Sequence, residues 1–536
     1  MNLKNFYLQK KGLIIFSVIL VLILLSSHLR FYKLTKTYSE YDENFMITLH
    51  KGALQDKEVS INLGPINKKF TIKLETLHNL EKSFLLPFYI AYGSTYSPGQ
   101  YAILPLILNK EDNYETIVKK NRSISALASI FTLVLLLYLL YKIENKFTWL
   151  SALTMSIFGF SINSIMYAHH GGVYSTYGLT SLIGLILVYL SIENKITTYK
   201  ALTINTFLLY FSYLNIFYLI IFFYIEFDKK NFKKFFFSFF LNKKKYLFVN
   251  LFFFIPILIS FLLKNEHKYH RGESLPEIAN FFNFISFFEK LIIQFYYSIK
   301  SLFSGFIPYT SGIFFLIVFC LLIISIINSL IKRKNSTKKK MLIVCLIYFL
   351  QWVILYCFGL IPLDQTRHIL TFFPIILVIF YISFEYLSVS KTIYLFLILS
   401  LVPFSYFNAK KTVENKISLY DLNYLNEQEE SLILTYDSLQ PLLFFENKNK
   451  KVYFTQLEQF KENYQKIKIT NRFLVVGHHK PFSKVEDRFK SNFPDIYDNY
   501  NIQVLIERKT KENYFYNNYK HSDNSNGFYV YRFIKK

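Results

Sequence analysis

The sequence has little charge and little cysteine for a chain of 536 residues. Charged residues make up 18% of the chain, whereas soluble domains carry about 25%. Its three cysteines, Cys320, Cys345 and Cys357, all fall in apolar runs, where free cysteine behaves as a small buried hydrophobe, so neither a disulfide framework nor a cysteine metal site is indicated. A glycine-rich phosphate loop is also absent, which argues against a nucleotide-binding site of that kind.

Long apolar runs are what the chain has instead, with 52% hydrophobic residues. The first, Leu13 to Leu29, follows three lysines and has no small-residue cleavage site, which predicts a retained membrane anchor. Others are long enough for a hydrocarbon core of about 30 Å. They cover 124–140, 149–167, 173–190, 246–263, 313–331, 341–358, 369–384 and 393–407. We therefore predict an α-helical polytopic membrane protein with about eleven spans.

The net charge of +25 is concentrated in short loops between the apolar runs. Residues 228–245 contain seven lysines and one aspartate, and residues 331–340 contain six lysines and arginines and no acid. Basic loops of this kind face the cytoplasm. The charge is therefore a topology signal rather than a nucleic-acid signal. It predicts a cytoplasmic N-terminus and an extracytoplasmic C-terminal part, in the plasma or inner membrane.

An acidic cluster follows the first run, in an outer segment of residues 30–110. Ser39 and Asp42 have the spacing of a capping box, and the apolar residues from Phe45 to Leu54 fit a short helix on the membrane surface. Capping accounts for one carboxylate but not for Glu43 beside it. A carboxylate at a helix N-terminus stays ionised at neutral pH, so Asp42 or Glu43 is a candidate general base at the membrane boundary.

Several motifs in chain order resemble the GT-C superfamily, nearest to the protein O-mannosyltransferases and the lipid A aminoarabinose transferases. They are Arg30 with Asp42-Glu43, the Arg122-led start of a span, the stretch from Ile165 to Ser175 with His169, His170 and Tyr174, and Arg367-His368 before Pro374. The likeness covers residues 13–407. Two departures, Tyr96 to Tyr101 without a Lys-Pro-Pro stretch and histidines where relatives have arginine, count against the acceptors of those two families.

The resemblance implies a glycosyltransferase whose sugar donor is linked to a polyprenyl phosphate and whose acceptor hydroxyl is extracytoplasmic. It marks Asp42 as the general base for an inverting transfer, with Glu43 holding the acceptor or a cation. Donor phosphate or sugar would be held by Arg30, Arg122, His169, His170, Tyr174, Arg367 and His368. It also implies that residues 84–108 form a juxtamembrane or re-entrant element and that residues 202–224 form two short helices.

No cofactor is required by this chemistry. His50 could join the acids around one divalent cation, yet no His-x-x-x-His or Asp-x-Asp pattern predicts a dedicated metal site. Snorkelling at a helix end is the alternative role for each arginine and histidine, and a place in the interfacial aromatic belt is the alternative for Tyr174.

The C-terminal part is predicted as a separate extracytoplasmic domain, 409–536, after a transmembrane domain of 1–408. Five short strand-like runs, 432–435, 452–455, 473–476, 502–506 and 527–533, alternate with charged helical stretches and predict a small mixed α/β domain. His478 and His479 follow one strand and fit a surface loop.

Three other functions fit parts of the pattern. A transporter or flippase of lipid-linked sugars would share the spans and basic loops, but it should show internal repeats and charges at mid-membrane, which the sequence lacks. A periplasmic polymerase or ligase of lipid-linked glycans would use outer arginines and histidines without needing Asp42. A scaffold with an outer sensor domain is the third.

Overall fold

The structure is a computed structural model of the whole chain, and it describes a subset of the residues. These are 3–37, 43, 59–60, 71–72, 98–109, 112–229, 296, 303, 312–332, 336–357, 369–387, 389–415, 422–435, 451–454, 469–477, 490, 494–509 and 527–536. The chain divides into two compact units. The first contains residues 1–32, 84–106 and 122–411, and the second contains residues 33–83, 107–121 and 412–536.

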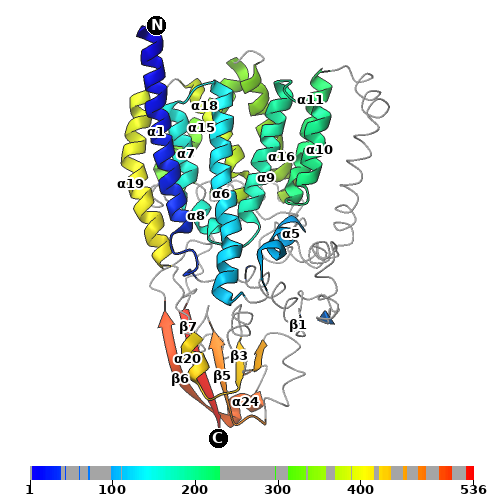
Figure 1. The fold of residues 1–536 in the computed structure, drawn as a ribbon, viewed down its shortest axis with the longest axis vertical. Helices are drawn as coiled ribbons and strands as arrows, with labels where there is room; N and C mark the ends of the chain where they lie inside the picture. The colour runs from blue at the N-terminus through cyan, green and yellow to red at the C-terminus, as the bar shows by residue number, and fades with distance from the viewer. Residues whose placement is uncertain are drawn as a thin grey trace, which may run out of the picture. The chain divides into compact units, whose positions relative to one another are not determined.

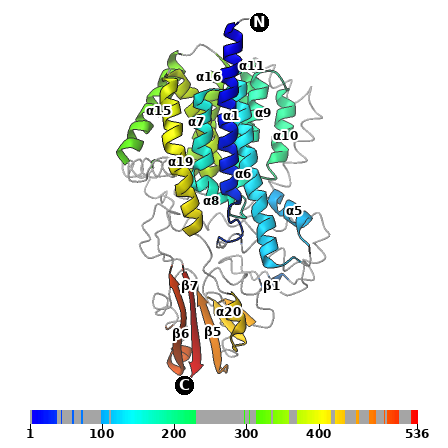
Figure 2. The same cartoon turned by 60° about the vertical axis from the view of Figure 1, so that its left-hand side comes forward.

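The regular elements of the first unit, in its described part, are all helices (Figures 1 and 2). Its elements are α1 (Leu3–Phe31), α5 (Pro98–Ile107), α6 (Tyr114–Glu144), α7 (Trp149–Phe160), α8 (Ile162–Ala168), α9 (Tyr174–Ile192), α10 (Thr198–Leu208), the 3-10 turn η1 (Tyr213–Ile216), α11 (Phe217–Lys229), α15 (Gly312–Lys332), α16 (Thr337–Cys357), the 3-10 turn η4 (Leu370–Phe372), α18 (Phe373–Tyr386) and α19 (Lys391–Asn415).

Four helices of the described part are long and apolar enough to cross a membrane: Gly12–Phe31, Glu115–Glu144, Tyr174–Ile192 and Lys391–Glu414. The pair α7 and α8 makes a fifth if it counts as one span bent by 53°. The apolar run 149–167 is thus two helices rather than the single one that periodicity predicted. Ser161 separates them: its hydroxyl accepts from the Ser164 N–H at 3.5 Å. The total of about eleven spans stays a prediction.

The region 202–224 contains the two short helices that the resemblance implied, α10 and α11 joined by η1. Of residues 84–108, the described part forms α5, which at ten residues is half the length needed to span a bilayer. The Gly99 N–H donates to the Tyr210 carbonyl at 2.6 Å, and a Cβ at Gly99 would lie 2.5 Å from the Phe211 ring. A larger residue at position 99 would therefore displace the Phe211 ring where α5 meets the α10–η1 turn.

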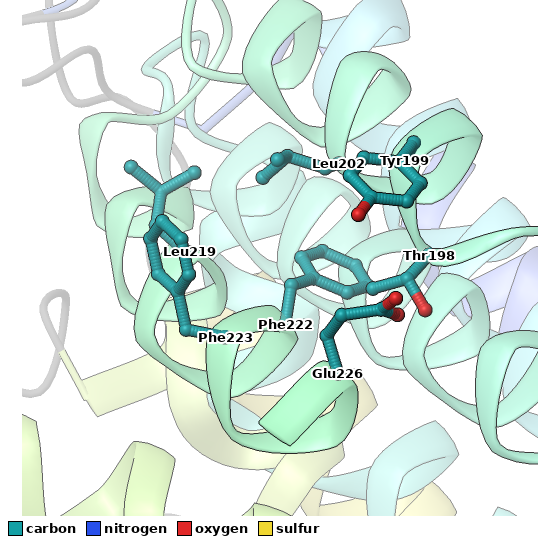
Figure 3. Close-up of a pocket in the computed structure, with 7 residues that line it drawn as sticks. All are labelled: Thr198, Tyr199, Leu202, Leu219, Phe222, Phe223 and Glu226. Atoms are coloured by element: carbon teal, nitrogen blue, oxygen red, sulfur yellow. The ribbon is translucent and has the colours of Figure 1, made fainter. Parts of the chain in front are cut away.

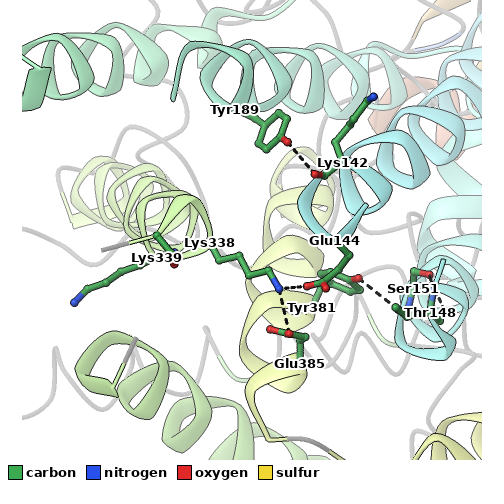
Figure 4. Close-up of polar contacts among 10 residues, drawn as sticks. Lys142, Glu144, Thr148, Ser151, Tyr189, Lys338, Lys339, Tyr381 and Glu385 are labelled. Carbon is green, nitrogen blue, oxygen red and sulfur yellow. Dashed lines mark hydrogen bonds and ion pairs between the residues drawn. The ribbon is translucent and has the colours of Figure 1, made fainter. Parts of the chain in front are cut away.

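Two ends of the helical unit can be told apart by their contacts. At one end, Lys338 at the start of α16 forms ion pairs with Glu144 of α6 and, at 3.1 Å, with Glu385 of α18 (Figure 4). We call this the Lys338 end. Tyr189 near the end of α9 donates to the Lys142 carbonyl at 2.9 Å in the same region. The opposite end, which we call the Arg30 end, therefore holds the C-terminus of α1 and the starts of α9 and α18.

The second unit contains a five-stranded mixed sheet in the order β4-β3-β5-β7-β6. The strands are β3 (Leu432–Thr435), β4 (Lys451–Phe454), β5 (Arg472–Gly477), β6 (Tyr500–Lys509) and β7 (Gly527–Lys535). β3 is parallel to β4 and β5, while β7 is antiparallel to β5 and β6. All five strands fall where the sequence predicted them.

Side chains alternate across this sheet and bury both of its faces. In β5, Phe473 and Val475 belong to one apolar cluster and Leu474 and Val476 to the other. The short helices α20 (Leu422–Glu427) and α24 (Pro494–Asn499) contribute Leu425 and Ile496 to these clusters. Two-residue strands β1 (Val59–Ser60) and β2 (Thr71–Ile72) pair separately. The site residues described next lie in the first unit.

Candidate functional site at the Arg30 end

Arg30, one residue before the end of α1, is fully buried in the first unit. Its Nε donates to the Ser129 hydroxyl of α6 at 2.7 Å, and its Nη2 donates to the Ser164 hydroxyl of α8 at 2.7 Å. Nη1 donates to the Gly159 carbonyl of α7 at 3.0 Å and to the carbonyl and hydroxyl of Ser26. One guanidinium therefore joins four helices.

All of these acceptors are neutral oxygens. Within the described part of the chain, no carboxylate forms an ion pair with Arg30, and its remaining neighbour of note is the Phe158 ring, 5.7 Å from the guanidinium carbon. Neutral hydroxyls and carbonyls stabilise a buried cation without cancelling its charge. The Arg30 end therefore carries a positive potential.

The loop from His169 to Val173, between α8 and α9, is fixed by contacts to two other helices. His169 Nε2 donates to the Leu29 carbonyl at the end of α1, at 2.8 Å. The Ser125 hydroxyl of α6 donates to the Gly172 carbonyl at 3.0 Å. The bend at Ser161 places this loop against the end of α1, next to Arg30.

The two adjacent histidines are held in the same tautomer, with the proton on Nε2, but they bond to the loop and to α1 through different ring nitrogens. Since the Leu29 carbonyl only accepts, His169 carries its proton on Nε2 and keeps a lone pair on Nδ1. In His170, Nδ1 accepts from the Gly172 N–H at 2.9 Å, so the proton of the neutral ring is on Nε2. The pair therefore presents one acceptor nitrogen and one donor N–H.

His170 is also fixed sterically. Its ring lies 5.8 Å from the Tyr174 ring and 6.2 Å from the Tyr167 ring, and all three side chains are buried. A Cβ at Gly172 would lie 2.5 Å from His170 Nδ1. Residue 172 must be glycine for the His170 ring to keep this position.

Arg122 lies on α6, three residues before Ser125, and is 1% exposed. Because Ser125 bonds to the Gly172 carbonyl, one turn of α6 brings Arg122 to the same end of the unit. The structure thus gathers five of the predicted site residues from four parts of the chain: Arg30, Arg122, His169, His170 and Tyr174.

The other predicted site residues are not part of this group. Glu43 is buried and belongs to the second unit. Asp42, Arg367 and His368 lie outside the described residues, as do His478 and His479. Among the residues that are described, no group of three His, Cys, Asp or Glu side chains could hold a metal ion.

Sequence reasoning missed the serines that hold Arg30. Ser26, Ser129 and Ser164 each stand inside an apolar run, where the sequence offers a hydroxyl but no sign of its partner. The sequence shows each of them only as a serine within an apolar run. A serine there can equally well donate to a carbonyl of the preceding helical turn, so it does not predict a bond to Arg30.

A small pocket at the Lys338 end lies between α10 and α11 (Figure 3). Seven residues line it: Thr198, Tyr199, Leu202, Leu219, Phe222, Phe223 and Glu226. Its lining is apolar apart from two hydroxyls and one carboxylate, and none of the predicted site residues reaches it. A phosphate would meet repulsion from Glu226 here, so this pocket is not a candidate for the anionic donor.

The helices and the site define a multi-pass, mostly helical membrane protein with a buried cationic site at one end of its helical unit. No protein-family model matches the chain, and no curated protein matches it. The solved structures that are similar to it include two that cover nearly its whole length.

Both solved structures are of ArnT from Cupriavidus metallidurans. The form bound to undecaprenyl phosphate is 10% identical to this chain, with a TM-score of 0.48 and 97% of each chain covered. The apo form is 9% identical, with a TM-score of 0.48 and 98% of each chain covered. At this identity and TM-score the likeness carries no argument about function, which rests on the residues above.

Proposed function

We propose that this protein is a membrane glycosyltransferase of the GT-C type. It would transfer a sugar from a polyprenyl-phosphate donor to an acceptor hydroxyl at the outer face of the membrane. The main support for this proposal is the positive potential of the buried Arg30, which neutral oxygens bind but do not cancel, beside Arg122 and two histidines.

Phosphate chemistry fits that arrangement. The leaving group of such a donor is a phosphate, which gains negative charge as the sugar departs, so preorganised cations and N–H donors stabilise the transition state. Arg122 would bind the phosphate oxygens through its planar fork. The His170 Nε2–H, on a ring held by Gly172 and Tyr174, would donate a further hydrogen bond.

Arg30 takes a different part in the proposal. Its three nitrogens already donate to Ser26, Ser129, Gly159 and Ser164, so it would act through its charge and by positioning the end of α1. That end leads directly into the segment carrying Asp42 and Glu43.

Asp42 would be the general base that takes the proton of the acceptor hydroxyl. Glu43 would hold the acceptor, and Arg367 and His368 would complete the phosphate site. Direct attack by the acceptor from the side opposite the phosphate inverts the anomeric configuration. The lipid would be a polyprenyl phosphate of the class that one of the similar ArnT structures is bound to.

Binding of polyprenyl phosphate alone tests the site without requiring transfer. We expect Arg122→Gln, in full-length protein in lipid nanodiscs, to weaken binding by about tenfold to a hundredfold, since a hydrogen bond to a charged group contributes about 1.5–3 kcal/mol. Lys338→Gln is the matched control, because Lys338 is a cation at the opposite end with two carboxylate partners.

Two results are opposed to the proposal. One is equal binding by the wild type and Arg122→Gln. The other is equal weakening in the Lys338→Gln control, which would show that general loss of positive charge matters rather than the Arg30 end.

A further inference from the structure

A group of buried polar side chains at the Arg30 end has no part in the phosphate site. It consists of Thr176 near the start of α9, Ser212 and Asn215 at η1, Trp352 near the end of α16 and Thr371 in η4, and we call it the Thr176 cluster. Each residue is at most 6% exposed. Each has a polar side-chain atom without a hydrogen-bond partner among the described residues: Thr176 Oγ1, Ser212 Oγ, Asn215 Oδ1, Trp352 Nε1 and Thr371 Oγ1.

The unpaired hydroxyl of Thr176 is unusual, as other threonines in the helices show. Thr132, Thr154 and Thr206 each donate to the carbonyl four residues earlier, at 2.8–2.9 Å. For Thr176 that carbonyl belongs to Gly172, and it already accepts from Ser125. Thr176 Oγ1 does not make the bond that a helical threonine normally makes, although a carbonyl oxygen has two lone pairs and could accept from both hydroxyls.

Contacts within the unit bring the members of the Thr176 cluster together. The Asn215 Nδ2 donates to the Thr180 carbonyl at 3.1 Å, one turn from Thr176 on α9. η4 packs against α9, where a Cβ at Gly178 would lie 3.6 Å from the Leu370 carbonyl, next to Thr371.

Aromatic rings connect η4 to α16. The Phe372 ring, adjacent to Thr371, lies 4.1 Å from the Trp352 ring and 5.4 Å from the Tyr348 ring. The Tyr348 hydroxyl in turn reaches the Leu214 carbonyl of η1 at 3.4 Å. Thr371, Trp352 and Asn215 are thereby linked through one aromatic group.

Farther from the Arg30 end, the polar side chains of Ser181, Tyr218 and Tyr348 form hydrogen bonds within the unit. The Tyr218 hydroxyl donates to the Ser181 carbonyl at 2.6 Å, and the hydroxyls of Ser181 and Tyr348 are 3.0 Å apart. Ser181, Tyr218 and Tyr348 are therefore hydrogen-bonded, whereas the five atoms of the Thr176 cluster are not. Single unpaired atoms such as Ser383 Oγ occur elsewhere in the unit, but a buried group without a partner costs stability, and a ligand that supplied the missing bonds would offset five such costs in one place.

The chemistry of the Thr176 cluster defines what that ligand would be. It offers hydroxyls, an amide oxygen and one indole N–H, which is a donor only, beside aromatic faces. None of its five side chains is charged. Sugar hydroxyls both donate and accept, and the C–H face of a pyranose packs on aromatic rings, whereas an ammonium or carboxylate would find no counter-charge among these five side chains.

We infer that the Thr176 cluster binds the sugar of the donor and selects an uncharged sugar. This inference rests on the proposed function, because the phosphate that carries the sugar would lie at Arg122. It goes beyond that function by naming the sugar class and the residues that recognise it.

The test uses full-length protein in lipid nanodiscs and three ligands: polyprenyl phosphate, polyprenyl-phosphate hexoses (glucose, galactose and mannose) and polyprenyl-phosphate aminoarabinose. Affinities come from ligand-induced shifts in thermal unfolding. The variants are Thr176→Val and Thr371→Val, which keep the shape of the side chain and remove one hydroxyl each, and Trp352→Phe, which removes the indole N–H together with part of the ring. Ser383→Ala is the matched control, since Ser383 Oγ is equally buried and unpaired but lies near the Lys338 end.

We expect each of the three variants to bind at least one neutral-hexose donor about fivefold to tenfold more weakly than the wild type, at about one hydrogen bond each. Affinity for polyprenyl phosphate should not change. Without ligand, Thr176→Val and Thr371→Val should unfold at the same temperature as the wild type or higher, because an unpaired buried polar atom has been removed. Trp352→Phe should unfold at a lower temperature, because the smaller ring leaves a cavity. Ser383→Ala should bind every donor as the wild type does.

Three results would overturn the inference. The variants could bind the neutral donors as tightly as the wild type, as they would if only water met these groups. The wild type could bind the aminoarabinose donor as tightly as the best hexose donor. If the wild type failed to bind even polyprenyl phosphate, the proposed function would fail and the inference with it, which distinguishes the two failures.

Discussion

Replacing Arg30 with lysine keeps the charge at the end of α1 and removes the fork that joins four helices. In the wild type, Nε reaches Ser129 and Nη2 reaches Ser164, each at 2.7 Å, while Nη1 holds the Gly159 carbonyl. A lysine has a single ammonium group on a flexible side chain, so it can replace the contacts of Nη1 but not those of Nε with Ser129 and of Nη2 with Ser164 as well.

The cost follows from the bonds that are lost. Two hydrogen bonds from a charged donor, at about 1.5–2 kcal/mol each, give a destabilisation of about 3–4 kcal/mol for Arg30→Lys. Ser129→Ala and Ser164→Ala each remove one of the same bonds and should cost about half as much. Thermal and denaturant unfolding of the full chain in nanodiscs, with Ser383→Ala as the control, measure these values. A loss below about 1 kcal/mol for Arg30→Lys would refute the view that Arg30 joins the helices.

Three further predictions concern other parts of the chain. Gly172→Ala should displace the His170 ring, whose Nδ1 lies 2.5 Å from the new Cβ, and should weaken polyprenyl-phosphate binding about tenfold at little cost in unfolding temperature; unchanged binding would contradict the role given to His170. Lys338→Met should destabilise the helical unit by about 1–3 kcal/mol, because it leaves two partly buried carboxylates without their shared cation. Sugar transfer should continue at the wild-type rate. A large loss of transfer would contradict the placement of the site at the Arg30 end. In the second unit, the Tyr500 hydroxyl donates to the Thr470 carbonyl at 2.6 Å, and burial raises the pKa of this hydroxyl. Its contribution to stability is therefore present below about pH 10, the pKa of tyrosine in the unfolded chain, and is lost as the pH rises through the folded pKa. Pulse proteolysis in urea should show this loss of stability in the wild type and a smaller loss in Tyr500→Phe.

Local patterns predicted much of the fold. α9, at residues 174–192, lies within two residues of the apolar run 173–190, and the five strands of the second unit lie where alternation placed them. Short-range periodicity is enough for such elements because each depends on its own side chains meeting lipid or core. Hydropathy did less well for α6, which begins at Tyr114, ten residues before its apolar run, because a helix can continue in polar sequence beyond the membrane.

The site could be predicted only in part. Arg30, Arg122, His169, His170 and Tyr174 were identified as single residues, but the bonds that gather them join positions 47 to 140 residues apart. No local period reports such a pair. The same holds for the Thr176 cluster, whose members look like ordinary polar residues until their partners, or the lack of them, are seen in three dimensions.

The break at Ser161 illustrates the remaining gap. Hydropathy predicts one span from Trp149 to Tyr167, since every residue of both helices suits a membrane or a core. The chain instead bends by 53° there and directs Ser164 and the histidine loop toward α1. A bend that depends on one serine hydroxyl and on a distant arginine is a tertiary effect.

The central claim is sugar transfer with Asp42 as the base, and one assay tests it most directly. Full-length protein and its Asp42→Asn variant are offered a set of polyprenyl-phosphate sugars together with a membrane extract as acceptor source, and both the product and the bound donor are measured. We predict that the wild type transfers one sugar with inversion of its anomeric configuration, and that Asp42→Asn binds the same donor as tightly but transfers it at least a hundredfold more slowly. Transfer by Asp42→Asn at the wild-type rate, or a product that retains the donor's configuration, would contradict the account.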